Sequence, residues 1–367
     1  MEQKRILVYG MVGTNRGGIE NYLLKMNSKM TDNTIFDYVV EEASCLHTDV
    51  INKRGGEVVY ISSRRNNPLK NIIDNYRLLK RNKQKYCSVY FNLSSLSWIL
   101  PIAIARLFKY KVFVHSHNAD FIPANSSRLH KITNYISKRF LSSFNIERLT
   151  CSKLAGDFMF MPSDKVEMIY NAVDVNLFKY DEEVRNKKRS ELSIPEDTFV
   201  IGFVGRLAHQ KNPLYLVKIM KSLPNLDKVL LLIVGDGPLR PEIEKEIDDQ
   251  IREHITFLGN RTDVNELYQV MDVFILPSFH EGLPYVVVEA QTTGLECLVS
   301  EFVTREVNYT NNVKFLPIDG DINIWSEAIE KTRFNPLNRV EMFKVMEESP
   351  FNINHEALRL EALLTDK

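Results

Sequence analysis

The feature that most constrains this chain is a repeated alternation of short apolar runs with stretches of helical periodicity. Such a rhythm is typical of a parallel β-sheet covered by helices. It runs through the first half, pauses after residue 170 and resumes near residue 200. Because 367 residues exceed what one core usually supports, two packed α/β domains are expected. The expected strands are Arg5–Tyr9, Glu57–Ile61, Ser88–Leu93, Lys111–His115 and Arg148–Ser152, then Val200–Val204, Val229–Val234, Ile255–Leu258, Val273–Leu276, Leu298–Ser300 and Lys314–Leu316.

The charge distribution supports the same division. Residues 1–170 carry 25 Lys and Arg against 14 Asp and Glu, although the whole chain has 47 of each. The positive potential of the first half suits an anionic partner, and the alternative is a solvated basic surface. The polar stretch Asp181–Glu191 shows no lasting apolar period, which places a linker near 171–178. We predict a first domain of residues 1–170, a second of 171–350, and a C-terminal helix in 351–367 as a candidate to pack back on the first.

Several classes of protein are disfavoured by composition. No run reaches the ~18–20 apolar residues that a membrane span needs, and the N-terminal segment lacks the pattern of a secretory signal, so a cytoplasmic location is expected. A neutral net charge without basic patches interleaved with aromatic residues argues against nucleic acid. No metal or disulfide site is expected, because the cysteines Cys45, Cys87, Cys151 and Cys297 lie far apart.

The most informative motif is ILPSFHEGLPYVVVE, residues 275–289. It indicates an apolar strand, a loop with Gly282 and Pro284, and a helix. Unpaired backbone N–H groups and the dipole at a helix N-terminus favour an anion such as a diphosphate. A carboxylate within that helix, Glu289, is suited to accepting sugar hydroxyls, and Glu281 precedes it with seven residues between them.

Two glycine loops follow other strands of the second half. The motif GRLAHQKNP, residues 205–213, places Arg206 and Lys211 at the end of a strand. Two cations there suit a leaving diphosphate without a metal ion. The sequence Gly235–Pro238 is a glycine turn in the same context, whereas the Asp319-Gly320-Asp321 triplet is interpreted as a turn and not as a metal site.

Two motifs of the first half also follow strands. GTNRGGIE, residues 13–20, is a glycine loop after the first strand, although its spacing is not that of a dinucleotide-binding fingerprint. His115 and His117 end another strand, where open α/β sheets place ligands. A core or supporting role for either histidine remains an alternative.

Taken in their order along the chain, and over nearly its whole length, these motifs resemble those of glycosyltransferase family 4, the retaining GT-B enzymes. They are most similar to the family's bacterial capsule and exopolysaccharide transferases. The resemblance implies two Rossmann-like, doubly wound domains facing a central cleft. The first would bind a glycan or lipid-diphosphate-linked acceptor and the second a nucleotide sugar. It also implies a metal-independent hexosyltransferase that needs no cofactor beyond its nucleotide-sugar co-substrate, which we expect to be UDP-linked.

Residue by residue, the resemblance implies that Glu281 and His117 are catalytic residues beside the transferred sugar. Glu289 would hold the nucleotide ribose, while Arg206 and Lys211 bind the diphosphate. The remaining positions implied to contact the donor are Gly17, Gly18, His115, Asn260, Arg261, Gly282, Leu283 and Pro284. The chain departs from the family's pattern at Glu296, where relatives commonly have a small residue and proline.

A basic segment raises the question of membrane contact. Arg64–Lys85 contains eight basic residues and one acid. With Ile72, Ile73, Tyr76 and Leu79 as an apolar face, it is a candidate for peripheral contact at the inner face of the cell membrane. The alternative is an ordinary basic helix packed on the sheet.

Three rival functions share the expected fold. A sugar-nucleotide epimerase would use the same donor site without an acceptor, and a non-catalytic partner subunit would keep the fold alone. A dinucleotide dehydrogenase is disfavoured by the glycine spacing.

Overall fold

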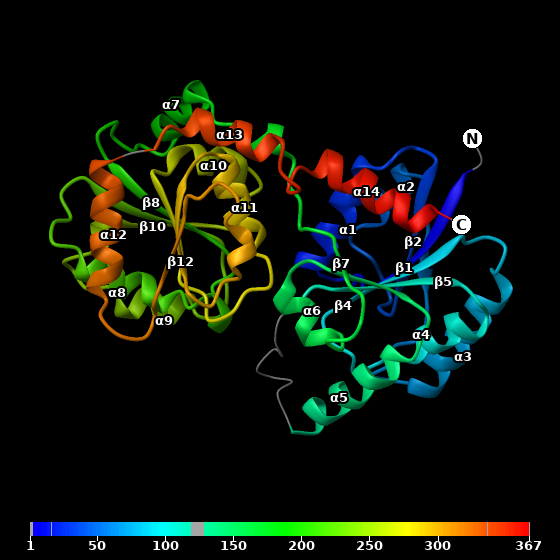
Figure 1. Ribbon diagram of the computed structural model, residues 1–367. Helices are drawn as coiled ribbons and strands as arrows, with labels where there is room; N and C mark the ends of the chain where they lie inside the picture. The colour runs from blue at the N-terminus through cyan, green and yellow to red at the C-terminus, as the bar shows by residue number, and fades with distance from the viewer. Residues whose placement is uncertain (1–2, 16, 119–127, 336, 367) are drawn as a thin grey trace. The chain divides into compact units, whose positions relative to one another are not determined.

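The computed structural model describes residues 3–15, 17–118, 128–335 and 337–366 of the chain (Figure 1). It divides into two compact units, one of Met1–Ala172 with Ile353–Lys367 and the other of Val173–Asn352. The division lies two residues after the predicted boundary at 170. Each unit is an α/β domain built on one parallel sheet, as the alternating sequence pattern predicts.

The first unit contains a seven-stranded sheet in the order β3-β2-β1-β4-β5-β6-β7. The order reverses at β1, so α1, α2 and α14 cover one face of the sheet and α3, α4 and α5 cover the other (Figure 1). Its strands are β1 (Lys4–Tyr9), β2 (Thr34–Val40), β3 (Val58–Tyr60), β4 (Ser88–Leu93), β5 (Lys111–Ser116), β6 (Glu147–Thr150) and β7 (Glu167–Met168). Its helices are α1 (Gly18–Lys29), α2 (Thr48–Lys53), α3 (Pro68–Arg81), α4 (Leu100–Leu107), α5 (Arg128–Ser142), α6 (Lys153–Met159) and α14 (Ile353–Thr365).

The second unit contains a six-stranded sheet in the order β10-β9-β8-β11-β12-β13. Its strands are β8 (Phe199–Val204), β9 (Val229–Val234), β10 (Ile255–Gly259), β11 (Val273–Leu276), β12 (Glu296–Ser300) and β13 (Val313–Leu316). Its helices are α7 (Glu182–Glu191), α8 (Leu214–Ser222), α9 (Arg240–Glu246), α10 (Val264–Val270), α11 (Tyr285–Thr292), α12 (Asn323–Phe334) and α13 (Arg339–Glu347), with short 3₁₀ helices η2 (Val175–Phe178), η3 (His209–Lys211), η4 (Arg252–His254) and η5 (Arg305–Val307).

The last helix, α14, belongs to the first unit although it follows the second in sequence. The carboxylate of Glu361 accepts hydrogen bonds from the backbone and side chain of Thr31 and from the Thr34 hydroxyl. Glu356 accepts a 2.7 Å bond from the backbone N–H of Tyr170. These buried acids fix the helix on α1 and the neighbouring strands, which is the packing that the sequence suggested for 351–367.

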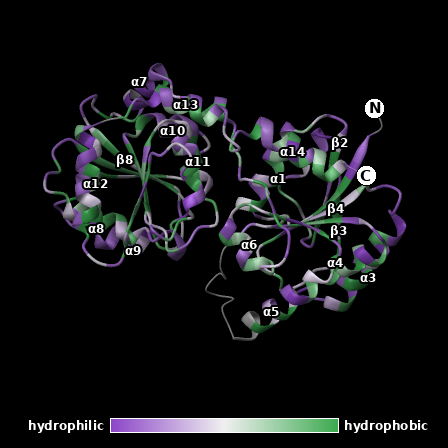
Figure 2. Ribbon diagram, viewed as in Figure 1, coloured by the Kyte–Doolittle hydropathy of each residue, from purple (hydrophilic) through white to green (hydrophobic). Residues whose placement is uncertain are grey.

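Two strands are absent from the sequence prediction, the two-residue strand β7 and the buried strand β2. The buried strand β2 was not predicted, because Asp37 interrupts its apolar run. This fully buried carboxylate is neutralised by Arg5 at 2.9 Å and Lys85 at 3.1 Å, so a charge is tolerated inside the sheet. Figure 2 shows the otherwise hydrophobic character of the strands.

A helix was also missed. Residues 182–191, where the sequence shows no lasting apolar period, form α7, and Asp181 caps the helix by accepting from the backbone N–H groups of Glu183 and Val184. Two buried cations, Lys188 and Arg189, attach α7 to the segment around α10. Long basic side chains therefore attach this helix to its neighbours, which is why its sequence shows no lasting apolar periodicity.

Candidate functional site

The predicted donor residues of the second unit lie in loops that follow its strands. In a parallel sheet these carboxyl ends share one edge, where α/β proteins bind ligands. The loop after β8 carries Arg206 and Lys211, the loop after β9 carries Gly235, and the loop after β11 leads through Glu281 into α11. The sheet order places β8 between β9 and β11, so the three loops are neighbours.

Lys211 and Glu281 form an ion pair at this edge. The Nζ atom of Lys211 lies 2.6 Å from Oε1 of Glu281, and their side chains are only 18% and 8% exposed. Little water competes for this contact, so it is stronger than a surface pair. The structure thus brings together two residues that the sequence assigned to separate tasks, the diphosphate and the sugar hydroxyls.

The two loops that carry this pair are joined by further contacts. The backbone N–H of Phe279 donates to the carbonyl of Gln210 at 2.9 Å, and the Gln210 side chain donates to the carbonyl of His280 at 3.1 Å. The rings of His209 and Phe279 stack with centroids 4.9 Å apart. These contacts hold the cation and the carboxylate in a fixed relation.

Arg206 is arranged differently from Lys211. It is exposed, and within the described part of the chain its guanidinium has no ion-pair partner. Its neighbour Leu207 exchanges backbone hydrogen bonds with the glycine turn, donating to Asp236 at 3.0 Å and accepting from Leu239 at 3.0 Å. The backbone at Arg206 is therefore anchored while its charged end is available to an anion.

The glycine turn after β9 supports this loop directly. Gly235 has φ +125°, and a Cβ atom there would stand 2.1 Å from the carbonyl oxygen of Gly205. A Cβ on Gly237 would stand 2.4 Å from the carbonyl oxygen of Leu207. Glycine is required at both positions because two backbone segments pack without side chains between them.

Glu289 is buried in the second turn of α11, with 8% of its surface exposed. Tyr268 of α10 donates its hydroxyl proton to Oε2 of Glu289 at 3.1 Å. Burial beside this carboxylate raises the pKa of Tyr268 well above its ordinary value, so the phenol remains a donor. Tyr268 orients the carboxylate, and no sequence motif pointed to this residue.

The other predicted donor residues of this unit have varied surroundings. Leu283 and Pro284 are buried, and Pro284 is the N-cap of α11 and not its first helical residue as expected. Gly282 is half-buried and Asn260 is exposed beyond β10. Arg261 binds both oxygens of Asp263, at 2.8 and 2.6 Å, so its charge is already compensated. The donor contacts of these residues stay predictions.

In the first unit, the glycine loop binds an anion of its own. The carboxylate of Glu20, which is 2% exposed, accepts from the backbone N–H of Val12 at 3.0 Å and of Gly17 at 2.9 Å. The N–H of Gly17 is thus engaged within the chain, and the contact of Gly17 with the donor stays a prediction. Gly18 opens α1, and a Cβ there would meet no atom within 4 Å.

The rings of the two histidines at the end of β5 lie against each other, tilted by 32° with centroids 4.1 Å apart. His115 is fully buried, and its Nδ1 lies 2.6 Å from the Tyr90 hydroxyl and 3.3 Å from the Tyr22 hydroxyl. The predicted direct contact between His115 and the donor is therefore corrected to a supporting position beneath His117. His117 itself is half-buried and keeps its place as the candidate.

Asn92 orients the imidazole of His117. Its Oδ1 lies 2.9 Å from Nε2 of His117, while its Nδ2 donates to the carbonyl of Tyr9 at 3.4 Å. This arrangement places the ring proton on Nε2 and leaves Nδ1 as an acceptor. Loss of contact with water lowers the pKa of His117 to about 3, so the ring is neutral at physiological pH.

Replacing Asn92 with aspartate is expected to raise the pKa of His117, because a carboxylate beside Nε2 stabilises the imidazolium. Protonated His117 would then accumulate as the pH falls through the new value, whereas the wild-type ring stays neutral until about pH 3. Histidine ¹⁵N chemical shifts measured across pH report this directly. Asn92→Ala is the control, since it removes the acceptor without adding charge. An unchanged titration in Asn92→Asp would contradict the geometry.

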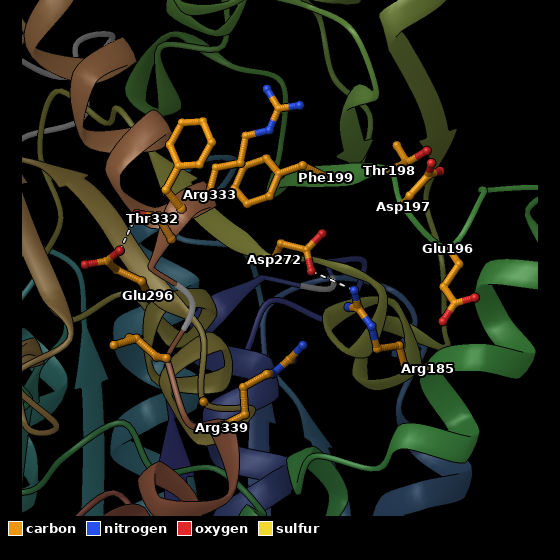
Figure 3. A pocket seen from close by; sticks show the side chains of 13 residues that line it. Arg185, Glu196, Asp197, Thr198, Phe199, Asp272, Glu296, Thr332, Arg333 and Arg339 are labelled. Atoms are coloured by element: carbon orange, nitrogen blue, oxygen red, sulfur yellow. Dashed lines mark hydrogen bonds and ion pairs between the residues drawn. The ribbon is translucent and has the colours of Figure 1, made fainter.

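A separate pocket of about 400 Å³ lies at the opposite, amino-terminal edge of the second sheet (Figure 3). Among its charged side chains, Arg185 binds Asp272 at 2.6 Å, and Glu296 contacts Thr332 and Lys314. Glu296, which departs from the family's sequence pattern, thus has its polar partners at the opposite edge of the sheet from the loops of the donor residues. The triplet 319–321 lies at a bend, with Gly320 at φ +123°. Among the described residues no cluster of three metal-ligating side chains occurs, nor is any helix long and apolar enough to cross a membrane.

Comparisons with known proteins agree on one class. A family model described as "Glycosyl transferases group 1" matches residues 184–343. The chain is 30% identical over 340 residues to the putative glycosyltransferase EpsF of Bacillus subtilis (strain 168), covering 90% of this chain and 88% of that protein. It is 31% identical over 245 residues, 63% of this chain and 62% of the relative, to the Escherichia coli UDP-Gal:alpha-D-GlcNAc-diphosphoundecaprenol alpha-1,3-galactosyltransferase.

Solved structures show the same architecture. Anabaena Alr3699/HepE in complex with UDP superposes with a TM-score of 0.80 at 18% identity, covering 99% of this chain and all of that one. WaaG, a glycosyltransferase involved in lipopolysaccharide biosynthesis, gives 0.72 at 14% identity, covering 99% of this chain and 100% of its own. Two parallel-sheet α/β domains of this kind define a GT-B protein. The chain belongs to the GT-B glycosyltransferases.

Proposed function

We propose that this glycosyltransferase is a retaining, family 4 enzyme of bacterial capsule or exopolysaccharide synthesis. It moves a hexose from a UDP-linked donor to a glycan or a lipid-diphosphate-linked acceptor. The observation that carries the proposal is the partly buried ion pair of Lys211 and Glu281, with the exposed Arg206 on the same loop as Lys211. The relationship to an enzyme that acts on a diphosphoundecaprenol-linked sugar supports the choice of acceptor.

The donor would be held by the second unit. Glu289, oriented by Tyr268, accepts the ribose hydroxyls, and Glu281 accepts hydroxyls of the sugar. Arg206 and Lys211 bind the diphosphate, and their attraction for it grows as the bond to the sugar breaks and negative charge develops. We therefore propose that departure of the diphosphate needs neither a metal ion nor another cofactor.

The first unit would receive the acceptor. Its neutral His117 presents Nδ1 as a hydrogen-bond acceptor toward a hydroxyl of the transferred sugar. No side chain that we assign in this unit is a carboxylate nucleophile, so we propose transfer on the face that the diphosphate leaves, with retention of configuration. The enzyme would work in the cytoplasm at the inner face of the membrane, where a UDP-sugar and a lipid-linked acceptor meet.

Calorimetric titration with UDP, GDP and ADP tests the donor assignment. We expect the wild-type protein to bind UDP selectively in the presence of EDTA, and Glu289→Ala to lose at least tenfold in affinity, because a charge-assisted bond contributes about 1.5–3 kcal/mol. Glu301→Ala, at an exposed acid of the same unit, is the matched control. Absence of binding to all three nucleotides would favour a non-catalytic subunit, and binding that disappears with EDTA would refute metal independence.

A further inference from the structure

The helix α5 exposes an apolar stripe to solvent. Ile132, Tyr135, Ile136 and Phe140 are 56%, 56%, 60% and 53% exposed. Their spacing of three and four residues places them on one side of the helix. The opposite side packs inward through Leu141, which is 1% exposed, and Asn134, whose Oδ1 accepts from the backbone N–H of Leu96 at 3.0 Å. The usual orientation of a surface helix, apolar side inward and polar side outward, is therefore not followed.

The helix α3 shows the same outward stripe. Leu69, Ile73 and Tyr76 are 73%, 46% and 40% exposed and recur at positions i, i+4 and i+7. This changes the apolar face expected from the sequence, because Leu79 is fully buried in the core and does not belong to it. The Tyr76 ring packs against Phe108 at a centroid distance of 5.1 Å, which links the stripe to the end of α4.

The three helices α3, α4 and α5 lie on one face of the first sheet (Figure 1), and α4 adds exposed side chains of its own, Leu100 and Leu107. The outer surface of these three helices is called the apolar-basic face below. Its sequence is strongly positive: residues 68–81, 100–107 and 128–142 contain nine Lys and Arg and one acid, Asp74. That acid accepts from the backbone N–H of Ser62 at 3.1 Å.

The helices on the other face of the sheet provide an internal comparison. Residues 18–29, 48–53 and 353–365 contain four Lys and Arg and four Asp and Glu. Exposed large apolar side chains are sparser there, and include Val50 and Leu358. The combination of apolar stripes with unbalanced positive charge is thus a property of one face and not of the domain as a whole.

We propose that the apolar-basic face docks on the surface of an anionic lipid bilayer. Apolar and aromatic side chains on such helices enter the boundary between headgroups and acyl chains, while Lys and Arg bind the negative headgroups. An aqueous anion would explain the charge but not the apolar stripes, so a lipid surface accounts for both. The inference extends the proposed function, since it names the surface by which the enzyme reaches a lipid-linked acceptor.

Flotation of the full-length protein with vesicles tests the proposal. The probes are vesicles of phosphatidylglycerol with phosphatidylcholine, and of phosphatidylcholine alone. We expect binding to the anionic vesicles that weakens as salt rises, because the Debye length shortens from about 10 Å at 0.1 M to about 3 Å at 1 M. The variant Ile132→Ser/Ile136→Ser/Phe140→Ser should lose about tenfold or more in vesicle partitioning, since three exposed apolar side chains are removed.

The matched control is Leu46→Ser/Val50→Ser, which removes exposed apolar side chains at and beside α2 on the opposite face. It should partition like the wild type. The proposal is overturned if the wild type ignores anionic vesicles at low salt, or if both variants lose binding equally. It is also overturned if the α5 variant only dissociates an oligomer of the lipid-free protein. The UDP affinity of the α5 variant, measured by calorimetry, is expected to be unchanged. Failure of the donor assignment can therefore be distinguished from failure of membrane docking.

Discussion

Lys211→Ala is expected to lower kcat about 10²- to 10³-fold, the loss typical of removing one group that stabilises charge in the transition state. The substitution removes a cation that would bind the departing diphosphate. It also leaves Glu281, whose side chain is 8% exposed, without its partner 2.6 Å away. Because the charge on the diphosphate grows along the reaction, we expect a larger effect on kcat than on KM.

The measurement is the initial rate of UDP release from a UDP-hexose, with and without a lipid-diphosphate-linked acceptor. Lys221→Ala is the control, since Lys221, in the last turn of α8, forms a more exposed ion pair with Asp248 at 2.9 Å and should leave kcat unchanged. Lys211→Ala and Glu281→Gln should be less than additive when combined, as expected for two groups that act as a unit. Full activity in Lys211→Ala would refute the role assigned to the pair.

The interpretation of this pair shows what sequence can and cannot provide. Glycine loops after apolar strands are local signals, so Arg206, Lys211, Glu281 and Glu289 were identified as candidates from sequence alone. The contact between Lys211 and Glu281 requires that β8 and β11 be adjacent, although about 70 residues separate the two side chains. Strand order is a property of the whole sheet, which no local pattern encodes.

The residues that orient the candidates were missed for the same reason. Asn92 reaches His117 because β4 and β5 pair in register, with Asn92 opposite His115. Tyr268 reaches Glu289 from a neighbouring helix, 21 positions away in sequence. Each of these side chains is ordinary in its own segment and acquires its role only through tertiary packing.

Burial also decides which residues of a motif are accessible to a ligand. Alternation along β5 places His115 and His117 on the same side of the strand, yet one ring covers the other, so only His117 keeps an exposed surface. The glycine loop likewise suggests an anion site, and the structure fills it with Glu20 of the same chain. A motif indicates the chemistry that a loop favours, but the surrounding side chains determine whether it is available.

Gly235→Ala is expected to have the largest effect on folding among substitutions near the site. The residue has φ +125°, and its new Cβ would stand 2.1 Å from the carbonyl oxygen of Gly205, the residue before Arg206. The unfavourable backbone conformation costs about 1–3 kcal/mol. Displacing a packed backbone segment adds about 1–3 kcal/mol. Because that segment continues into Arg206 and Lys211, we also expect donor affinity to fall.

Gly320→Ala separates the cost of the backbone conformation from the cost of the steric clash. Gly320 has nearly the same φ, +123°, but a Cβ there would meet no atom within 4 Å. Denaturant unfolding should therefore show only the backbone cost in Gly320→Ala, and the difference between the two variants measures the clash with Gly205. UDP affinity should fall in Gly235→Ala alone. Equal losses of stability and affinity in both variants would show that the packing between the two glycine loops does not shape the donor site, because the one feature that distinguishes the two positions would then have no effect.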